Sequence, residues 1–471
     1  MIGRLKPYQA MKDSGVPWLG AVPEHWTVAA LRHRYSQCLG KMLDSKRIRG
    51  EHSVPYLRNI DVQWDRINTL GLPVMDITEA EYGRYTVQPG DLLVCEGGEV
   101  GRAAVWQGTL ALCGFQKALH RLRPLSRKDD DPRFIMFVLM AASAAGAFYD
   151  GHESTIAHLT GDKLRSHRFP FPDGVEQTAI VRFLDHISLQ IRHYIGAKRR
   201  LIKLLEEQKQ AIIYRAVTRG LNANVRLKPS GVDWLGDVPE HWQIQRNGQL
   251  FAQRNETGFP NLPILEVSLR TGIRIRDFEL SNRKQVMTDR GKYKKAMAND
   301  IAYNMMRMWQ GAVDCVPVDG LVSPAYIVAR PLVGTHSRYF SNLFRTSAYM
   351  DEVDKYSRGI VSDRNRLYWE DFKQMPSPCP PEAEQAEIAQ SIQQQTQGAN
   401  DTIERVRDVI ARIYEYRTRL IADAVTGKLD VRATVSALPE TAEEPEVIEV
   451  LGADDGELDG VGDDEVEEEA A

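Results

Sequence analysis

A thirteen-residue segment occurs twice in this chain, and it constrains the fold more than any other feature. Residues 14–26 read SGVPWLGAVPEHW, and residues 230–242 read SGVDWLGDVPEHW. The two copies differ at two positions and lie 216 residues apart. Solenoid and propeller repeats have periods of roughly 20 to 50 residues, so each copy here must belong to a whole domain with its own core. The sequence therefore predicts two similar domains in tandem.

A second pair of repeated segments predicts a long helix after each domain. Residues 176–180 (EQTAI) recur as 384–388 (EQAEI), and residues 216–221 (AVTRGL) recur as 424–429 (AVTGKL), both at an offset of 208. Each long segment follows a proline-containing stretch and then contains no proline, which favours an uninterrupted helix. At 1.5 Å per residue, some 43 residues give a helix of about 65 Å.

The apolar residues of both helices alternate at spacings of four and three, which is a heptad pattern. It predicts a seam in the first helix at Ile180, Leu184, Ile187, Ile191, Tyr194, Lys198, Leu201, Leu205, Gln208 and Ile212. In the second helix the same register gives Ile388, Ile392, Gln395, Ala399, Thr402, Val406, Val409, Ile413, Tyr416 and Leu420. We expect the two helices to pair as an antiparallel coiled coil. The alternative is that each helix packs only on its own domain.

The regions between the repeats have the size of one domain each, at 149 residues (27–175) and 141 residues (243–383). Both contain short β-rich runs punctuated by glycine and proline, at 91–95, 103–106 and 325–329. One buried helix is expected in each, over 134–148 and around 337–356; the first is too short to span a bilayer. The predicted fold is α+β, with two mixed α/β domains separated by two long helices in an internal pseudo-twofold repeat.

The charge of the chain is unevenly distributed. The net charge is −4, but residues 433–471 hold fifteen acidic residues and no Lys or Arg, so residues 1–432 carry +11. We expect the acidic tail to be disordered, and either to act as a solubilising extension or to compete with nucleic acid for basic surfaces. The N-terminal stretch lacks the apolar core of a signal peptide, and the five scattered cysteines form no CxxC pair. These features predict a cytoplasmic protein without a disulfide framework or a zinc site.

Clustered basic residues predict contacts with DNA. Lys and Arg bind phosphate without reading sequence, whereas Arg, Asn and Gln can also form bidentate contacts with base edges. For any one of these side chains the alternative is a solvated surface position. The predicted DNA contacts are Lys41, Lys46, Arg47, Arg49, Arg58, Asn59, Gln63 and Arg102 in the first domain, and Arg270, Arg274, Arg276, Lys292, Lys294 and Arg307 in the second.

Sequence motifs for catalysis are missing. The chain has no GxxxxGK[ST], HExxH, GxSxG or GxGxxG motif and no Asn-Pro-Pro-aromatic box. The glycine-rich segment 97–101 lacks the spacing of a nucleotide cradle and is interpreted as a turn. His25 and His241 lie in the repeated Pro-Glu-His-Trp. With Trp18, Trp26, Trp234 and Trp242 they favour an apolar latch at a domain boundary over an acid–base pair.

The layout as a whole resembles the specificity subunits of type I restriction-modification systems. The resemblance covers about residues 8–432 and depends on the two WLG…PEHW motifs, on 89–94 (PGDLLV) matching 298–303 (ANDIAY), on 307–312 (RMWQGA) with 322–326 (VSPAY), and on the paired helices. It implies a first target recognition domain at 1–175 with its motif at 14–26, a spacer helix at 176–218, a second recognition domain at 219–383 with its motif at 230–242, a second spacer helix at 384–426 and an acidic tail at 433–471. The first domain has Cys95-Glu96-Gly97-Gly98 where the second has Met305, Arg307 and Trp309, so different half-sites are expected.

The resemblance further implies a non-catalytic subunit that binds double-stranded DNA with a bipartite, asymmetric target. Two methyltransferase subunits and two restriction subunits are the implied partners, with no membrane. S-adenosylmethionine, ATP and Mg²⁺ would belong to those partners, and no cofactor or metal to this chain. The helices would set the gap and dock subunits through Ile180, Leu184, Ile187, Ile191, Leu201, Leu205, Ile388, Ile392, Val406, Val409, Ile413 and Leu420. The alternatives are a nuclease or methyltransferase, against which the missing motifs argue, and a tandem-domain protein-binding scaffold, against which the basic clusters argue.

Overall fold

The structure is a computed structural model that describes residues 6–43, 50–149, 158–269, 272–276, 289–359 and 365–439. The described residues form two compact units. Unit 1 contains those up to residue 197 together with those from 408 on, and unit 2 contains residues 198–407. Each unit contains one copy of the duplicated thirteen-residue segment. The boundaries between the units, at 197/198 and 407/408, fall inside the two long helices, so each unit contains part of both helices.

Unit 1 is built around an antiparallel four-stranded sheet with the strand order β10-β9-β12-β4. Its strands are β4 (Tyr35–Leu39), β9 (Leu92–Cys95), β10 (Ala103–Val105) and β12 (Leu119–Pro124), of which β9 and β10 match predicted strands. The other elements of this unit before the long helix are β1 (Met11–Asp13), β2 (Ala21–Pro23), β3 (Thr27–Ala30), β5 (Ser53–Leu57), β6 (Val62–Gln63), β7 (Arg66–Ile67), β8 (Val74–Asp76), α1 (Tyr82–Tyr85), β11 (Gly114–Phe115), α3 (Gly161–Ser166) and β13 (Arg168–Phe171).

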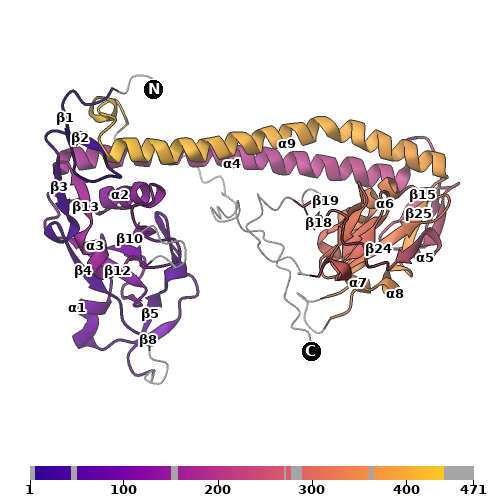
Figure 1. The fold of residues 1–471 in the computed structure, drawn as a ribbon, viewed down its shortest axis with the longest axis horizontal. Helices are drawn as coiled ribbons and strands as arrows, with labels where there is room; N and C mark the ends of the chain where they lie inside the picture. Colours follow the sequence, from indigo (N-terminus) through magenta and orange to yellow (C-terminus); the bar gives the residue numbers. More distant parts are fainter. Residues whose placement is uncertain are drawn as a thin grey trace. The chain divides into compact units, whose positions relative to one another are not determined.

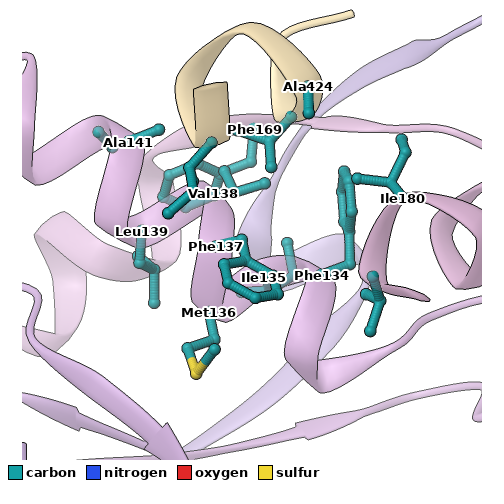
Figure 2. Packing of buried hydrophobic residues seen from close by; sticks show 14 of the residues in the cluster. Phe134, Ile135, Met136, Phe137, Val138, Leu139, Ala141, Phe169, Ile180 and Ala424 are labelled. Atoms are coloured by element: carbon teal, nitrogen blue, oxygen red, sulfur yellow. The ribbon is translucent and has the colours of Figure 1, made fainter. Parts of the chain in front are cut away.

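Helix α2 (Pro132–Ala144) packs against this sheet and is the buried helix expected at 134–148. It begins where Asp131 accepts a hydrogen bond from the Arg133 amide at 2.8 Å, with proline in the first turn. Phe134 to Leu139 are all fully buried, because α2 lies among the sheet, β13 and both long helices. Figure 2 shows Phe134 close to Ile180, whereas Met136 and Leu139 extend from another side of α2.

Unit 2 repeats the sheet with the same connectivity, in the order β17-β24-β21-β22. The strands are β17 (Phe251–Arg254), β21 (Ile301–Asn304), β22 (Val313–Cys315) and β24 (Tyr326–Pro331). The other short elements are β14 (Leu227–Pro229), β15 (Asp237–Pro239), β16 (Gln243–Arg246), α5 (Asn247–Leu250), β18 (Leu265–Ser268), β19 (Gly272–Ile275), β20 (Lys294–Ala296), β23 (Gly320–Val322), α8 (Trp369–Phe372) and β25 (Pro376–Cys379). β17 therefore corresponds to β4, β24 to β12, β21 to β9 and β22 to β10.

The helix expected around 337–356 is two helices, α6 (Ser337–Phe344) and α7 (Ser347–Tyr356). Thr346 takes an extended backbone conformation between them and caps α7, accepting from the Tyr349 amide at 3.4 Å. The break allows Phe340, Phe344 and Tyr349 to enter one aromatic core around Phe251. Sequence periodicity did not reveal this capped break.

The long helices are α4 (Gly174–Arg219) and α9 (Glu382–Val425), whose ends lie within two residues of the predicted ones. In unit 1 the start of α4 and the end of α9 share a core through Leu184 and Ile421, and in unit 2 the end of α4 and the start of α9 do so through Val217 and Ile388 (Figure 1). The helices are therefore paired antiparallel, as predicted. The alternative also holds in part, because the helix ends pack on their own domains.

The predicted seam is correct in one column, and in the other it holds only in part, because Ile180 and Ile388 are buried and Ile187 is half-buried there. Leu184, Ile191, Lys198, Leu205 and Ile212 are buried or half-buried as expected. The alternate column is displaced by one residue, because Ser188, Ile195, Ile202 and Lys209 are covered while Leu201 is exposed. The same displacement occurs in α9, where Thr396, Ile403, Ile410 and Arg417 are covered and Val409 is exposed. Of the docking positions predicted, Leu201 and Val409 therefore do not lie in the seam.

The packed chain extends past Ala433, where the acidic tail was expected to begin. Helix α10 (Arg432–Val435) follows α9, and Val431, Val435 and Leu438 are buried in the core of unit 1. Arg182 of α4 donates to the carbonyls of Leu438 and Pro439 at 3.0 and 2.7 Å. The acidic residues 440–471 lie outside the described residues. None of the helices in the described ranges combines the length and apolar character needed to cross a bilayer.

Candidate nucleic-acid interface

A buried carboxylate joins the first Pro-Glu-His-Trp motif to helix α4. Glu176 is 4% exposed, and one of its oxygens accepts a hydrogen bond from the Tyr8 hydroxyl at 2.5 Å. Its other oxygen accepts from the Trp26 indole at 3.1 Å and lies 2.9 Å from His25 Nε2. Burial, together with this hydrogen bond, raises the pKa of Tyr8 well above its usual value. The Arg432 guanidinium lies over the Tyr8 ring at 5.0 Å. The motif is thus a latch, but a polar carboxylate rather than apolar contact joins its aromatic residues.

The second motif forms the same latch on α9. Glu384 accepts from the Trp242 indole at 3.1 Å and lies 2.7 Å from His241 Nε2. Its side chain is 26% exposed, because this unit has neither a tyrosine nor an arginine in the places of Tyr8 and Arg432 among the contacts described. The repeated Glu-Gln that starts each long helix was noticed in the sequence, but its partner across about 150 residues was not.

The glutamine beside each latch fastens a loop of its domain to the helix. Gln177 accepts from the Asp131 amide at 2.9 Å and donates to the carbonyls of Asp129 and Pro172 at 3.0 Å. Gln385 accepts from the His336 amide at 2.8 Å and donates to the carbonyls of Gly334 and Pro380. Latch and glutamine together hold each sheet at the start of a long helix.

Two of the predicted DNA contacts in unit 1 are brought to one loop. Asn59 donates to the Gly97 carbonyl at 2.9 Å, and Arg102 donates to Asn59 Oδ1 at 2.9 Å. Both side chains therefore brace the glycine-rich segment 96–101, which connects β9 to β10. This segment is a turn, as predicted.

The other predicted contacts of unit 1 lie elsewhere. Lys41 pairs with Glu81 at 2.7 Å, and this interaction lowers the pKa of the Glu81 carboxyl. Arg58 pairs with Asp61 at 2.9 Å, and Gln63 donates to the Ile60 carbonyl at 2.8 Å. Lys46, Arg47 and Arg49 lie outside the described residues.

In unit 2 the predicted contacts are spread over three places. Arg274 is 61% exposed and pairs with Glu266 across the β18–β19 hairpin, where Arg276 is half-buried. Lys292 is exposed, whereas Lys294 donates to the Tyr326 carbonyl at 2.8 Å, and burial lowers its pKa. Arg307 lies half-buried in the β21–β22 connection. Arg270 lies outside the described residues.

A buried aspartate at the start of a strand organises each sheet. Asp91, before β9, is fully buried and pairs with Arg123 of β12 at 2.5 Å. Asp300, before β21, is 2% exposed and pairs with Arg254 of β17 at 2.7 Å. The aspartates are equivalent, but their arginines come from different strands. Each sheet is a rigid platform for its β9–β10 or β21–β22 loop.

Within the described ranges, no group of His, Cys, Asp or Glu side chains is placed to hold a metal ion. The buried thiols of Cys95, Cys113 and Cys315 have a raised pKa, because burial disfavours the thiolate. Raised thiol pKa values do not favour nucleophilic chemistry.

Residues 39–198 match the family model described as the type I restriction modification DNA specificity domain. A relative in Escherichia coli, the type I restriction enzyme EcoDI specificity subunit, is 22% identical over 306 residues, which cover 59% of this chain and 66% of the relative. Over the matched residues the chain is similar to the specificity subunits of type I restriction-modification systems.

A solved structure shares the fold of this chain. A solved chain, described under the structural basis of complex assembly and conformational transition of the type I R-M system, superposes with a TM-score of 0.59 at 13% identity and covers 87% of this chain and 99% of its own. The crystal structure of an HsdS subunit from Thermoanaerobacter tengcongensis gives a TM-score of 0.41 at 14% identity, with 87% and 98% covered. The match with the Escherichia coli relative spans just under two thirds of that protein's length.

Proposed function

We propose that each unit of this specificity subunit recognises one half of a bipartite, asymmetric DNA site. The supporting observation is that both units repeat one four-stranded sheet, latched in the same way to a long helix, while the connections at the sheet edges differ. Two similar readers on one chain suit two target halves, and unlike loops suit halves of unlike sequence. The +11 charge of residues 1–432 favours DNA as the partner.

The partners follow from the same duplication. Two methyltransferase subunits dock on the two copies of the latch and helix pair, and restriction subunits join the complex through them. S-adenosylmethionine, ATP and Mg²⁺ belong to those partners in this proposal, and the sequence carries none of the nucleotide- or metal-binding motifs named above. The antiparallel helices set the number of unread base pairs between the two halves, since α4 and α9 each belong to both units.

The test is to co-express this chain with the methyltransferase subunit of its system and to map adenine methylation in host DNA by single-molecule sequencing. The expected result is methylation at a two-part motif with a fixed gap, which disappears when this chain is omitted. Methylation at a single continuous motif, or methylation that does not depend on this chain, would contradict the proposal.

A second test addresses the helices. One heptad is inserted into α4 beside Glu206 and one into α9 beside Arg407, which pair across the two helices at 3.1 Å, so that the paired register is kept. We expect the gap between the half-sites to widen while both half-site sequences stay the same. An unchanged gap would exclude the spacer role, and the matched control carries a heptad in α4 alone, which should unfold the pair.

A further inference from the structure

The loop between β9 and β10 and the loop between β21 and β22 are held in the same frame. The Leu159 amide donates to the Glu96 carbonyl at 2.8 Å, at the start of the first loop, and the Leu367 amide donates to the Met305 carbonyl at 2.9 Å, at the start of the second. Leu159 and Leu367 are themselves 208 residues apart, the offset of the long helices. In each unit, therefore, one main-chain hydrogen bond fixes the first residue of the loop.

The exits of the two loops are also equivalent. Gly101 and Gly311 have φ angles of 83° and 89°, in the left-handed region that favours glycine. A Cβ on Gly101 would lie 2.6 Å from the Phe148 ring, and a Cβ on Gly311 would lie 2.9 Å from Met350 Sδ. Phe148, which follows α2, therefore covers the end of the first loop, and Met350 of α7 covers the end of the second. Both loops thus have a fixed path.

Inside this common frame the side chains have opposite chemistry. The first loop presents two carboxylates, with Glu96 half-buried and Glu99 50% exposed at its side chain. The second loop presents Arg307 and Trp309, both half-buried, and an exposed Gln310. If the two domains must distinguish different DNA half-sites, we expect their loops to share the same backbone supports and to differ in the side chains that they present.

The exposed groups are held in place by neighbours. The Trp64 indole donates to Glu99 Oε1 at 2.5 Å. The Asn59 side chain donates to the Gly97 carbonyl, and the Arg102 guanidinium donates to the Asn59 carbonyl. In the second loop the Trp309 indole donates to the Met306 carbonyl at 2.9 Å, and the Met306 amide donates to Asn304 Oδ1 at 2.9 Å. Preorganised polar groups lose little conformational entropy on binding, which is what base recognition needs.

Basic side chains lie along the chain beside each loop. Arg358 and Arg366 form a β-bridge just before Leu367, and Arg358 is 74% exposed. His158 contacts Gly97 in unit 1, and Lys163 follows in α3. Side chains of these types commonly contact phosphates in protein–DNA complexes.

We propose that these two loops are the base-reading elements of the two domains, an inference that rests on the function proposed above. The carboxylates of Glu96 and Glu99 accept hydrogen bonds from exocyclic amino groups in the major groove, on cytosine N4 or adenine N6. Arg307 donates to guanine O6 and N7, and the amide of Gln310 pairs with adenine. Asn59 and Arg102, predicted as DNA contacts, are positioning residues for the first loop.

The test uses the complete complex and the methylation map as readout. Glu99→Gln keeps an oxygen for the Trp64 indole but removes the charge, and its control is Glu79→Gln, an exposed carboxylate in the same domain. In unit 2, Gln310→Ala is compared with Gln253→Ala, another exposed glutamine. We expect Glu99→Gln to lower discrimination at one base pair of one half-site by roughly 5- to 150-fold, and Gln310→Ala to do the same in the other half-site.

The gap, the remaining bases and both control maps should stay unchanged. If both loop variants return the wild-type motif, or lose methylation equally at every site while unfolding at the wild-type temperature, the loops do not read bases. A second pair, Glu96→Gln and Arg307→Gln, applies the same criterion should either first variant be unstable. A wild-type complex without a two-part motif would instead refute the function proposed above, so the two failures are distinguishable.

Discussion

At the scale of single residues, the same carboxylate is used twice in unequal surroundings. Glu176 has three hydrogen-bonding neighbours and is almost fully buried, whereas Glu384 has two and is partly exposed. A buried donor that loses its acceptor costs about 1 to 3 kcal/mol, and a solvated one costs less because water replaces the acceptor. The two latches should therefore differ in their contribution to stability.

We predict that Glu176→Ala lowers the free energy of unfolding by about 3 kcal/mol, because it leaves the Trp26 indole and the Tyr8 hydroxyl buried without an acceptor. Glu384→Ala, the matched variant in unit 2, should cost about 1 kcal/mol. Urea denaturation followed by tryptophan fluorescence measures both values. Equal losses in the two variants would show that the extra contacts of Glu176 contribute nothing.

A second residue-scale prediction concerns the buried ion pair of unit 2. Arg254→Ala removes the guanidinium that faces Asp300, which is 2% exposed, and a buried charge that loses its partner costs about 3 to 5 kcal/mol. Arg274→Ala removes an exposed partner of Glu266 and should change stability by less than about 1 kcal/mol. Calorimetry of the two variants gives the comparison, and a similar melting temperature for both would contradict it.

At the scale of elements, the long helices show how far a heptad pattern predicts packing. Apolar residues lie on both sides of the column that contains Leu184, Ile191 and Leu205, so the sequence permits two alternate columns. The predicted one contains Ile187 and Leu201, and the observed one contains Ser188 and Ile195. Neighbouring residues are separated by about 100° around a helix, so only the packing partner decides which of them is covered.

The observed register predicts unequal effects for adjacent residues of α9. Ile410 is 4% exposed, so Ile410→Ala should leave a cavity and lower the free energy of unfolding by about 2 to 4 kcal/mol. Val409 is 39% exposed, so Val409→Ala should lower the free energy of unfolding by less than about 0.5 kcal/mol. Thermal unfolding of the two variants by circular dichroism checks this. A larger loss for Val409→Ala would restore the register expected from the sequence.

The covered lysine of α4 gives a pH-dependent prediction. Burial lowers the pKa of Lys209 from 10.5, so the folded state binds a proton less readily than the unfolded chain. Lys209→Met should therefore raise stability at neutral pH, and the exposed control Gln208→Met should not. Wild-type stability should rise relative to Lys209→Met as the pH approaches 10.5, because the unfolded chain then also loses the proton. Melting curves between pH 7 and pH 10 measure this convergence, and a constant difference would exclude it.

At the scale of the whole molecule, both ends of the described chain belong to unit 1. Lys6 and Asp430 form an antiparallel bridge, and Val431, Val435 and Leu438 complete the same core. Ending the chain after Asp430 should therefore destabilise unit 1 by several kcal/mol, at about 1.5 to 3 kcal/mol for each buried aliphatic side chain. Ending it after Pro439 keeps the core and should leave the melting temperature unchanged. Scanning calorimetry of the two truncated chains tests this, and a loss in the second would assign stability to the acidic tail.

The sequence determined those features that depend on local pattern or on internal comparison. The duplicated Pro-Glu-His-Trp motif predicted two similar domains, and the two proline-free segments predicted α4 and α9. The short apolar runs predicted β9, β10 and β24. Repeats and periodicity are visible in the sequence itself. Asn59 and Arg102 were predicted as DNA contacts, and the structure places both side chains beside the β9–β10 loop. These inferences needed no knowledge of which distant residues meet.

The tertiary structure alone decided the features that depend on long-range contacts. The acceptor for Trp26 lies 150 residues away on α4, and the arginines that pair with Asp91 and Asp300 come from different strands. No local pattern marks such partners, because a buried charge or indole is satisfied by whichever group the fold brings within hydrogen-bonding distance. The covered face of each long helix and the break between α6 and α7 were set in the same way, by the surfaces against which these residues pack.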